Sequence, residues 1–249
     1  MFVADPLQVQ LIVPKVVQCA GGLLLARTMA KKADESRYVL SRVFAALFGA
    51  WALVAACDAV MYPIAANGPG WLVVANLLRD VAAVGLFSVT LLSFVAAQVI
   101  RSGTQWFSRG KTAATVAAFV ALAAAGVAFD RMAVVDSATG QEIAHLPPTT
   151  SDFRVTAVIT FPVVLVYLVN LGLITYGVLV LFASYRSEDD PVVKCKSREV
   201  TAGLALLLVG YYYFLVLTSL GVRLAVLYWG GYLLWLASPA LVYRGIRPR

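Results

Sequence analysis

Seven apolar stretches, each long enough to cross a lipid bilayer, constrain this chain more than any other feature of its sequence. A helix needs about 20 predominantly apolar residues to span the hydrocarbon core. Charged or turn-forming residues separate the stretches, which cover residues 7–26, 39–66, 71–100, 112–135, 153–185, 200–220 and 224–243. The sequence therefore predicts an all-α fold: one domain, a polytopic bundle of seven transmembrane helices.

The composition excludes an ordinary soluble domain. Of the 249 residues, 61% are hydrophobic and only 13% are charged, whereas soluble proteins contain about 25% charged residues. Too few charges remain to cover the surface of a globule of this size. We therefore expect a multi-pass protein of the cell membrane, with the lipid bilayer as its first partner.

The positions of Lys and Arg predict the orientation of the bundle, because short loops rich in these residues stay in the cytoplasm. The opposite side has the longest connection, residues 136–152, which contains acidic residues and no Lys or Arg. The N-terminus is therefore predicted outside and the C-terminus in the cytoplasm. Fifteen of the twenty basic residues lie on the predicted cytoplasmic side: Arg27, Lys31, Lys32, Arg37, Arg42, Arg101, Arg109, Lys111, Arg186, Lys194, Lys196, Arg198, Arg244, Arg247 and Arg249.

This distribution also accounts for the formal net charge of +7. The excess is spread over four separate segments as a topology signal, which argues against a nucleic-acid partner. The basic inner face, notably Lys31 and Lys32, is expected to attract anionic lipid by about 1 kcal/mol per residue near the surface. The same loops are a candidate contact for a membrane or cytoplasmic protein partner. The residues before the first stretch include Asp5 and no basic residue, which favours a retained helix over a cleaved signal.

The inventory of reactive side chains argues against metal, cofactor and catalytic sites. His145 is the only histidine, and Cys19, Cys57 and Cys195 are scattered, so neither a haem held by two histidines nor a His-rich metal site is expected. The layout is similar to that of the microbial rhodopsins. The stretch 224–243 has no lysine to hold retinal as a Schiff base, however. We expect no cofactor and no enzymatic activity.

The candidate site is a layer of polar residues in the outer half of the bundle. Lys15, Asp58 and the pair Arg79 and Asp80 each lie about eight residues from the outer ends of their segments, which is roughly 12 Å below the boundary. Gln18 follows Lys15 by about one helical turn. Ionisable groups inside a span cost about 2.5–3.5 kcal/mol each and usually face the interior in pairs. We therefore predict a ligand site or ion-pair site at Lys15, Gln18, Asp58, Arg79 and Asp80.

The pairing within this layer can also be predicted. Arg79 and Asp80 are consecutive and point about 100° apart around their helix, so they cannot serve the same neighbour. We predict that Arg79 pairs with Asp58 and that Asp80 pairs with Lys15. Asn170 and Thr175 are expected to supply hydrogen bonds between helices at mid-depth.

Three functions remain open, and the first is favoured. The chain is a seven-helix receptor or sensor with an outward-facing buried polar site, a non-catalytic integral subunit of a larger membrane complex, or a small solute or proton transporter. A solvent-connected polar cluster favours the receptor and the transporter. A dry, fully paired cluster favours the subunit, in which the charges only fix the register of the helices.

Overall fold

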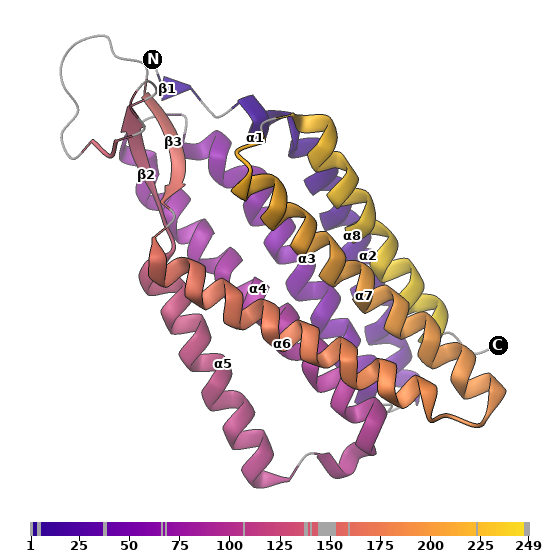
Figure 1. Cartoon of the computed structure of the whole chain (residues 1–249). Helices are drawn as coiled ribbons and strands as arrows, with labels where there is room; N and C mark the ends of the chain where they lie inside the picture. The colour runs from indigo at the N-terminus through magenta and orange to yellow at the C-terminus, as the bar shows by residue number, and fades with distance from the viewer. Residues whose placement is uncertain are drawn as a thin grey trace.

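The computed structural model describes residues 2–246 except 4–5, 37–38, 66, 68, 107, 137–138, 140, 144–152, 159 and 223. Long helices form a bundle with a small sheet at one end (Figure 1). The helices are α1 (Pro6–Gln10), α2 (Ile12–Ser36), α3 (Val39–Ala65), α4 (Leu72–Ser102), α5 (Arg109–Phe129), α6 (Phe161–Arg186), α7 (Pro191–Ser219) and α8 (Ala225–Ile246), with short 3₁₀ turns η1 (Pro69–Trp71) and η2 (Gly103–Trp106). The strands are β1 (Phe2–Val3), β2 (Arg131–Asp136) and β3 (Phe153–Val158).

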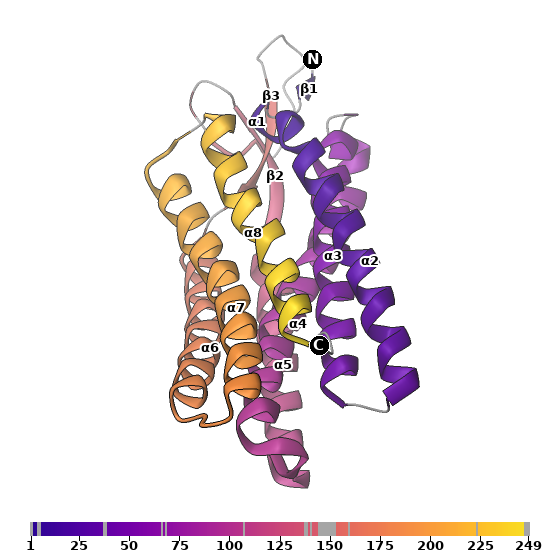
Figure 2. The same ribbon diagram turned by 90° about the vertical axis from the view of Figure 1, so that its right-hand side faces the viewer.

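Six helices among the described residues, α3 to α8, are long and apolar enough to cross a membrane. The protein is therefore a multi-pass integral membrane protein. The first predicted span, residues 7–26, is also helical, with a break at Leu11 between α1 and α2. Helix α2 runs beside α3 in both views (Figures 1 and 2). Its sequence includes Lys15, Gln18 and a charged end, so it is not one of the six, and the structure supports six of the seven predicted spans.

The predicted spans 112–135 and 153–185 are too long, because residues 131–136 and 153–158 form strands instead of helix ends. Strand β3 lies between the other two: it pairs in parallel with β1 and antiparallel with β2, with Val134 opposite Val155. A short apolar run rich in β-branched residues has no periodicity that separates a strand from a buried helix end. Helix α5 therefore ends at Phe129 and α6 begins at Phe161.

Small residues allow the helices to approach closely. A Cβ atom on Gly126 would overlap the ring of the buried Phe87, which brings α5 against α4. A Cβ on Gly203 would lie 2.8 Å from the carbonyl oxygen of Ser238, so α7 and α8 pack backbone to backbone. Such approach is the usual reason for glycine at contacts between membrane helices.

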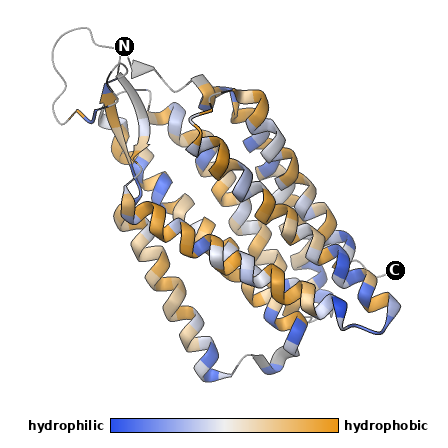
Figure 3. Ribbon diagram, in the orientation of Figure 1, coloured by the Kyte–Doolittle hydropathy of each residue, from blue (hydrophilic) through white to orange (hydrophobic). Residues whose placement is uncertain are grey.

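The ends of the bundle differ in polarity. Successive helices run in alternate directions, so the connections α2–α3, α4–α5 and α6–α7 lie at the end opposite the sheet, with the C-terminal end of α8 (Figures 1 and 2). Hydrophilic residues gather at these helix ends, whereas the middles of the helices are apolar (Figure 3). Asp190 caps α7 there by accepting hydrogen bonds from the amides of Val192 and Val193. His145 and the basic residues Arg37, Arg223, Arg247 and Arg249 lie outside the described residues.

Candidate functional site at the sheet end of the bundle

The first polar cluster at the sheet end surrounds Lys15, whose side chain is only 2% exposed. Its Nζ lies 3.1 Å from Oδ2 of Asp58 and also donates to the Asp58 backbone oxygen (3.0 Å) and to Oε1 of Gln8 (2.9 Å). The ammonium group lies 5.3 Å from the ring centre of Tyr62, within the range of a cation–π contact. These partners match the three donors of an ammonium group, so the buried charge is compensated.

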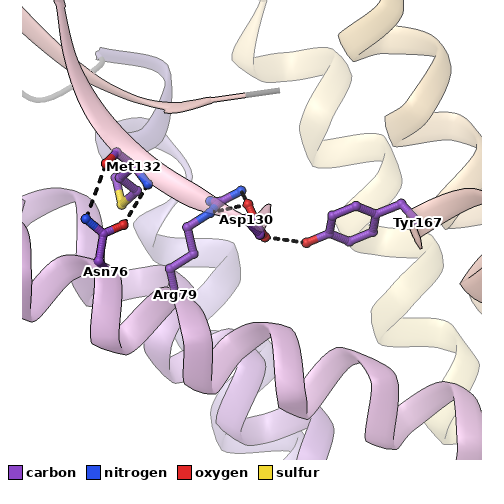
Figure 4. Close-up of polar contacts among 5 residues, drawn as sticks. All are labelled: Asn76, Arg79, Asp130, Met132 and Tyr167. Atoms are coloured by element: carbon purple, nitrogen blue, oxygen red, sulfur yellow. Dashed lines mark hydrogen bonds and ion pairs between the residues drawn. The ribbon is translucent and has the colours of Figure 1, made fainter. Parts of the chain in front are cut away.

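The second cluster joins α4, α6 and the end of α5 (Figure 4). Nε of Arg79 donates to Oδ1 of Asp130 at 2.6 Å, and Nη2 of Arg79 forms an ion pair with the same oxygen. The other carboxylate oxygen accepts a 2.6 Å hydrogen bond from the hydroxyl of Tyr167. The side chain of Asp130 is 3% exposed and that of Arg79 is 15% exposed. Asp130 directly follows α5, so the end of this helix supplies the counter-ion of Arg79 on α4.

Polar contacts attach the sheet to the bundle. The Asn76 side chain donates to the backbone oxygen of Met132 (3.2 Å) and accepts from its amide (2.7 Å), which fixes β2 on α4 (Figure 4). On the outer surface, Arg131 donates two hydrogen bonds of 2.6 and 2.8 Å to Glu142. These bonds stabilise the carboxylate and hold the pKa of Glu142 below its usual value.

The structure corrects both predicted pairs. Lys15 binds Asp58 rather than Asp80, and Arg79 binds Asp130 rather than Asp58. Asp80 is partly exposed, and no described side chain forms a hydrogen bond or ion pair with it. The prediction was wrong because depth along a helix was known but direction around it was not. Gln18 is buried away from both pairs, where it lines a small cavity with Trp51 and Trp235.

A cavity of about 610 Å³ lies at the sheet end, where α6 and α7 diverge (Figure 1). Most of its lining is apolar. Gln8 and Tyr62 of the first cluster and Arg79 and Tyr167 of the second also line it, so both clusters form part of the cavity wall. The polar lining residues are Gln8, Tyr62, Arg79, Thr156, Tyr167, Asn170, Tyr211, Thr218 and Tyr228.

Asn170 is an unsatisfied polar group in the wall of this cavity. Its side chain is buried at 4% exposure, and Oδ1 has no hydrogen-bond partner among the described residues. A buried acceptor without a partner costs about 1–3 kcal/mol. The predicted interhelical bond from Asn170 is therefore absent from the described structure, whereas Thr175 does contact the Tyr212 hydroxyl at 3.3 Å. The described residues also offer no hydrogen-bond partner for the hydroxyl of Tyr211.

Sequence reasoning missed four members of the clusters: Gln8, Tyr62, Asp130 and Tyr167. Gln8 carries a usable signal, because it lies seven residues before Lys15 and two helical turns bring it to the same face. Asp130 was not among the residues predicted for the site, although it forms the ion pair with Arg79. Tyr167 has no such signal, since a tyrosine within an apolar helix usually only packs.

The described residues contain no group of three or more His, Cys, Asp or Glu side chains that could hold a metal ion. The chain matches no protein-family model, and a comparison with curated proteins finds no similar sequence.

Proposed function

We propose that this integral membrane protein is a receptor that binds a small molecule in the cavity between α6 and α7. The observation that carries the proposal is a cavity of about 610 Å³ whose apolar wall includes the buried, unpartnered amide oxygen of Asn170. Small-molecule sites typically measure about 300–1,000 Å³ and combine an apolar lining with a few converging polar groups. An acceptor buried without a partner becomes satisfied when a bound molecule supplies a donor.

The proposal includes α2 as a seventh membrane-crossing helix and the sheet end as the outer end. Lys15 is the main obstacle to inserting α2, and its pairing with Asp58 removes the uncompensated charge. Basic residues such as Lys31, Arg109 and Lys194 belong to the opposite ends of their helices, as expected of a cytoplasmic side. The cavity then lies in the outer half of the membrane, where it can receive an extracellular or membrane-borne signal.

The experiment compares the small molecules that co-purify with the wild-type protein and with a variant whose cavity is filled by a larger side chain. Asn170→Phe fills the cavity and removes the acceptor. The matched control is Leu179→Phe, which adds an aromatic ring to the same helix at a position that is 59% exposed. Small molecules extracted from each preparation are identified by mass spectrometry. We expect a species that is present in the wild type and in the control but absent from Asn170→Phe. Identical extracts from all three proteins would contradict the proposal.

A second candidate function, a subunit of a larger membrane complex, is favoured by α5. Only 11% of the apolar stretch of α5 is buried inside the bundle, against 28–61% in the other five candidate spans. A partner helix packed on this face would cover it. The test is the native mass of the gently extracted protein, with any co-purifying chains identified. Stable association with other membrane chains supports this candidate, and a lone chain contradicts it.

A further inference from the structure

We infer that the ligand of the cavity between α6 and α7 is a neutral, lipid-soluble amphipath that enters from the bilayer. Such a molecule has a long apolar body and one hydroxyl or amide donor. The inference rests on the proposed function and adds the chemical class of the ligand and its route. Charge, hydrogen-bonding capacity and exposure each support it separately.

The charges of the cavity wall argue for a neutral ligand. Among the described residues, Arg79 is the only one with a charged side chain that lines the cavity. Both contacts of the Arg79 guanidinium are to Oδ1 of Asp130. The other carboxylate oxygen, Oδ2, accepts the hydrogen bond from Tyr167. A charged ligand would have to break this buried pair, or remain without a counter-ion where charges are poorly solvated. A neutral molecule leaves the pair intact.

The free hydrogen-bonding groups indicate a single polar end on the ligand. Asn170 lies nine residues from the start of α6, and Tyr211 lies eight residues before the end of α7. The two residues lie at different depths, because Thr175, five residues after Asn170, contacts Tyr212, the residue next to Tyr211. The Oδ1 of Asn170 accepts a donor, and the Tyr211 hydroxyl can donate or accept. One hydroxyl group on the ligand supplies the donor that Oδ1 of Asn170 lacks, while the remaining wall is mainly apolar.

The exposed part of the lining faces the lipid. Val164, Leu168 and Leu215 border the cavity and are 38%, 49% and 42% exposed, so the cavity is open beside α6 and α7. They belong to apolar spans, so the surface that they form lies against hydrocarbon in a membrane. The contact between Thr175 and Tyr212 joins the two helices further from the sheet end. The opening between the helices thus leads sideways into the bilayer.

Residues of the sheet and of the turn between α7 and α8 also line the cavity. They are Thr156 and Ala157 of β3 and Gly221 of the turn. A molecule that enters from the bilayer between α6 and α7 does not pass these segments.

The test uses photolabelling of the full chain in phosphatidylcholine vesicles. Three probes carry the same diazirine group: a hexadecanol, a hexadecane that lacks the hydroxyl, and a leucine added in water. Labelled residues are mapped by mass spectrometry. We expect the alcohol to label residues of the cavity wall roughly two- to tenfold more than the alkane, the ratio that one hydrogen bond provides. The aqueous leucine should not label them.

Two variants separate the polar contact from the entrance. Asn170→Leu removes the acceptor at similar volume and should equalise labelling by the alcohol and the alkane. Leu168→Trp narrows the opening, keeps Asn170 and should slow labelling by both lipid probes. Leu179→Trp, on the lipid-facing side of the same helix, is its matched control and should label as the wild type does. If Asn170→Leu does not fold, the smaller change Asn170→Ala also removes the acceptor and provides the same readout.

The outcomes distinguish this inference from the proposed function. Equal labelling of the wild type by alcohol and alkane overturns the amphipath. Labelling of the cavity by leucine alone overturns entry from the bilayer but leaves a ligand-binding receptor standing. Absence of label from the cavity with all three probes rejects both the inference and the proposed function.

Discussion

Asp130 is the side chain on which the sheet end of the bundle most depends, because it serves α4 and α6 at once. The change Asp130→Asn leaves Arg79 charged and only 15% exposed, without a counter-ion. Removal of one partner of a buried pair costs about 3–5 kcal/mol. Tyr167→Phe removes only one hydrogen bond to a charged group, a loss of about 1.5–3 kcal/mol. We expect this order in equilibrium unfolding in detergent micelles.

The double variant Asp130→Asn with Tyr167→Phe is the control for this order. Both changes act on the same carboxylate, so their combined effect should be smaller than the sum of the two. An Asp130→Asn protein that unfolds at the same denaturant concentration as the wild type would contradict the buried pair.

The Lys15 pair should respond asymmetrically to removal of its two charges. Asp58→Asn leaves a cation that is 2% exposed, whereas Lys15→Met leaves a carboxylate that is 35% exposed and can be hydrated. We therefore expect Asp58→Asn to lower the unfolding free energy more than Lys15→Met does. Thermal unfolding of both variants in the same detergent measures the difference. Equal losses would contradict the difference in burial, and a greater loss in Lys15→Met would mean that the carboxylate is the more buried partner.

At this scale the sequence predicts which residues are polar inside the bundle but not how they pair. Lys15 and Asp58 lie close enough to form an ion pair, and Arg79 lies in a neighbouring cluster. Depth follows from counting residues, since each adds 1.5 Å. Pairing depends on the rotation of each helix about its axis, which is set by contacts across the whole bundle. The free acceptor of Asn170 depends on the same geometry.

The sheet is the element that sequence patterns missed, and Glu142 gives a way to test how it is held. Ile143 donates its amide to Val134, which extends β2 beyond the turn. The ion pair between Arg131 and Glu142 holds this segment after the turn against β2. Because hydrogen bonds from Arg131 lower the folded pKa of Glu142, the pair stabilises the fold above the ordinary pKa of a glutamate. This contribution is lost as the pH falls through the lowered value.

Hydrogen exchange of the peptide 131–143 measures this loss. After correction for intrinsic rates, protection should be constant near neutral pH and should fall below about pH 4, near the ordinary pKa of a glutamate. Glu142→Gln should exchange faster at neutral pH and lack this pH dependence. Asp189→Asn, a change of an exposed acid at the other end of the bundle, should match the wild type. If Glu142→Gln retains the pH dependence, another group controls it.

Helix positions were easier to predict than the ends of helices. Apolar length predicts a span, and α3, α4 and α8 lie within a few residues of the predicted ranges. The ends depend on pairing with distant strands, as between Val134 and Val155, and no local pattern in the sequence encodes that pairing.

For the molecule as a whole, the orientation of the bundle can be tested with cysteine labelling. Cys195 lies near the start of α7, at the end opposite the sheet, and Thr139 lies at the sheet end. In a chain with Cys19→Ser, we expect a membrane-impermeant maleimide to modify Cys195 only after the cells are permeabilised. With Cys195→Ser and Thr139→Cys added, modification should occur on intact cells. The opposite pattern would reverse the proposed orientation.

Strand β1 joins the beginning of the chain to a segment about 150 residues further on, since Phe2 pairs with Phe153. During synthesis, helices α1 to α5 and strand β2 must all leave the ribosome before the partner of β1 exists. Such distant contacts form late, because a long loop must close first. The sheet is therefore a closing step of biogenesis, and a bulky tag fused to the N-terminus should interfere with assembly at this step and leave the insertion of earlier helices unaffected.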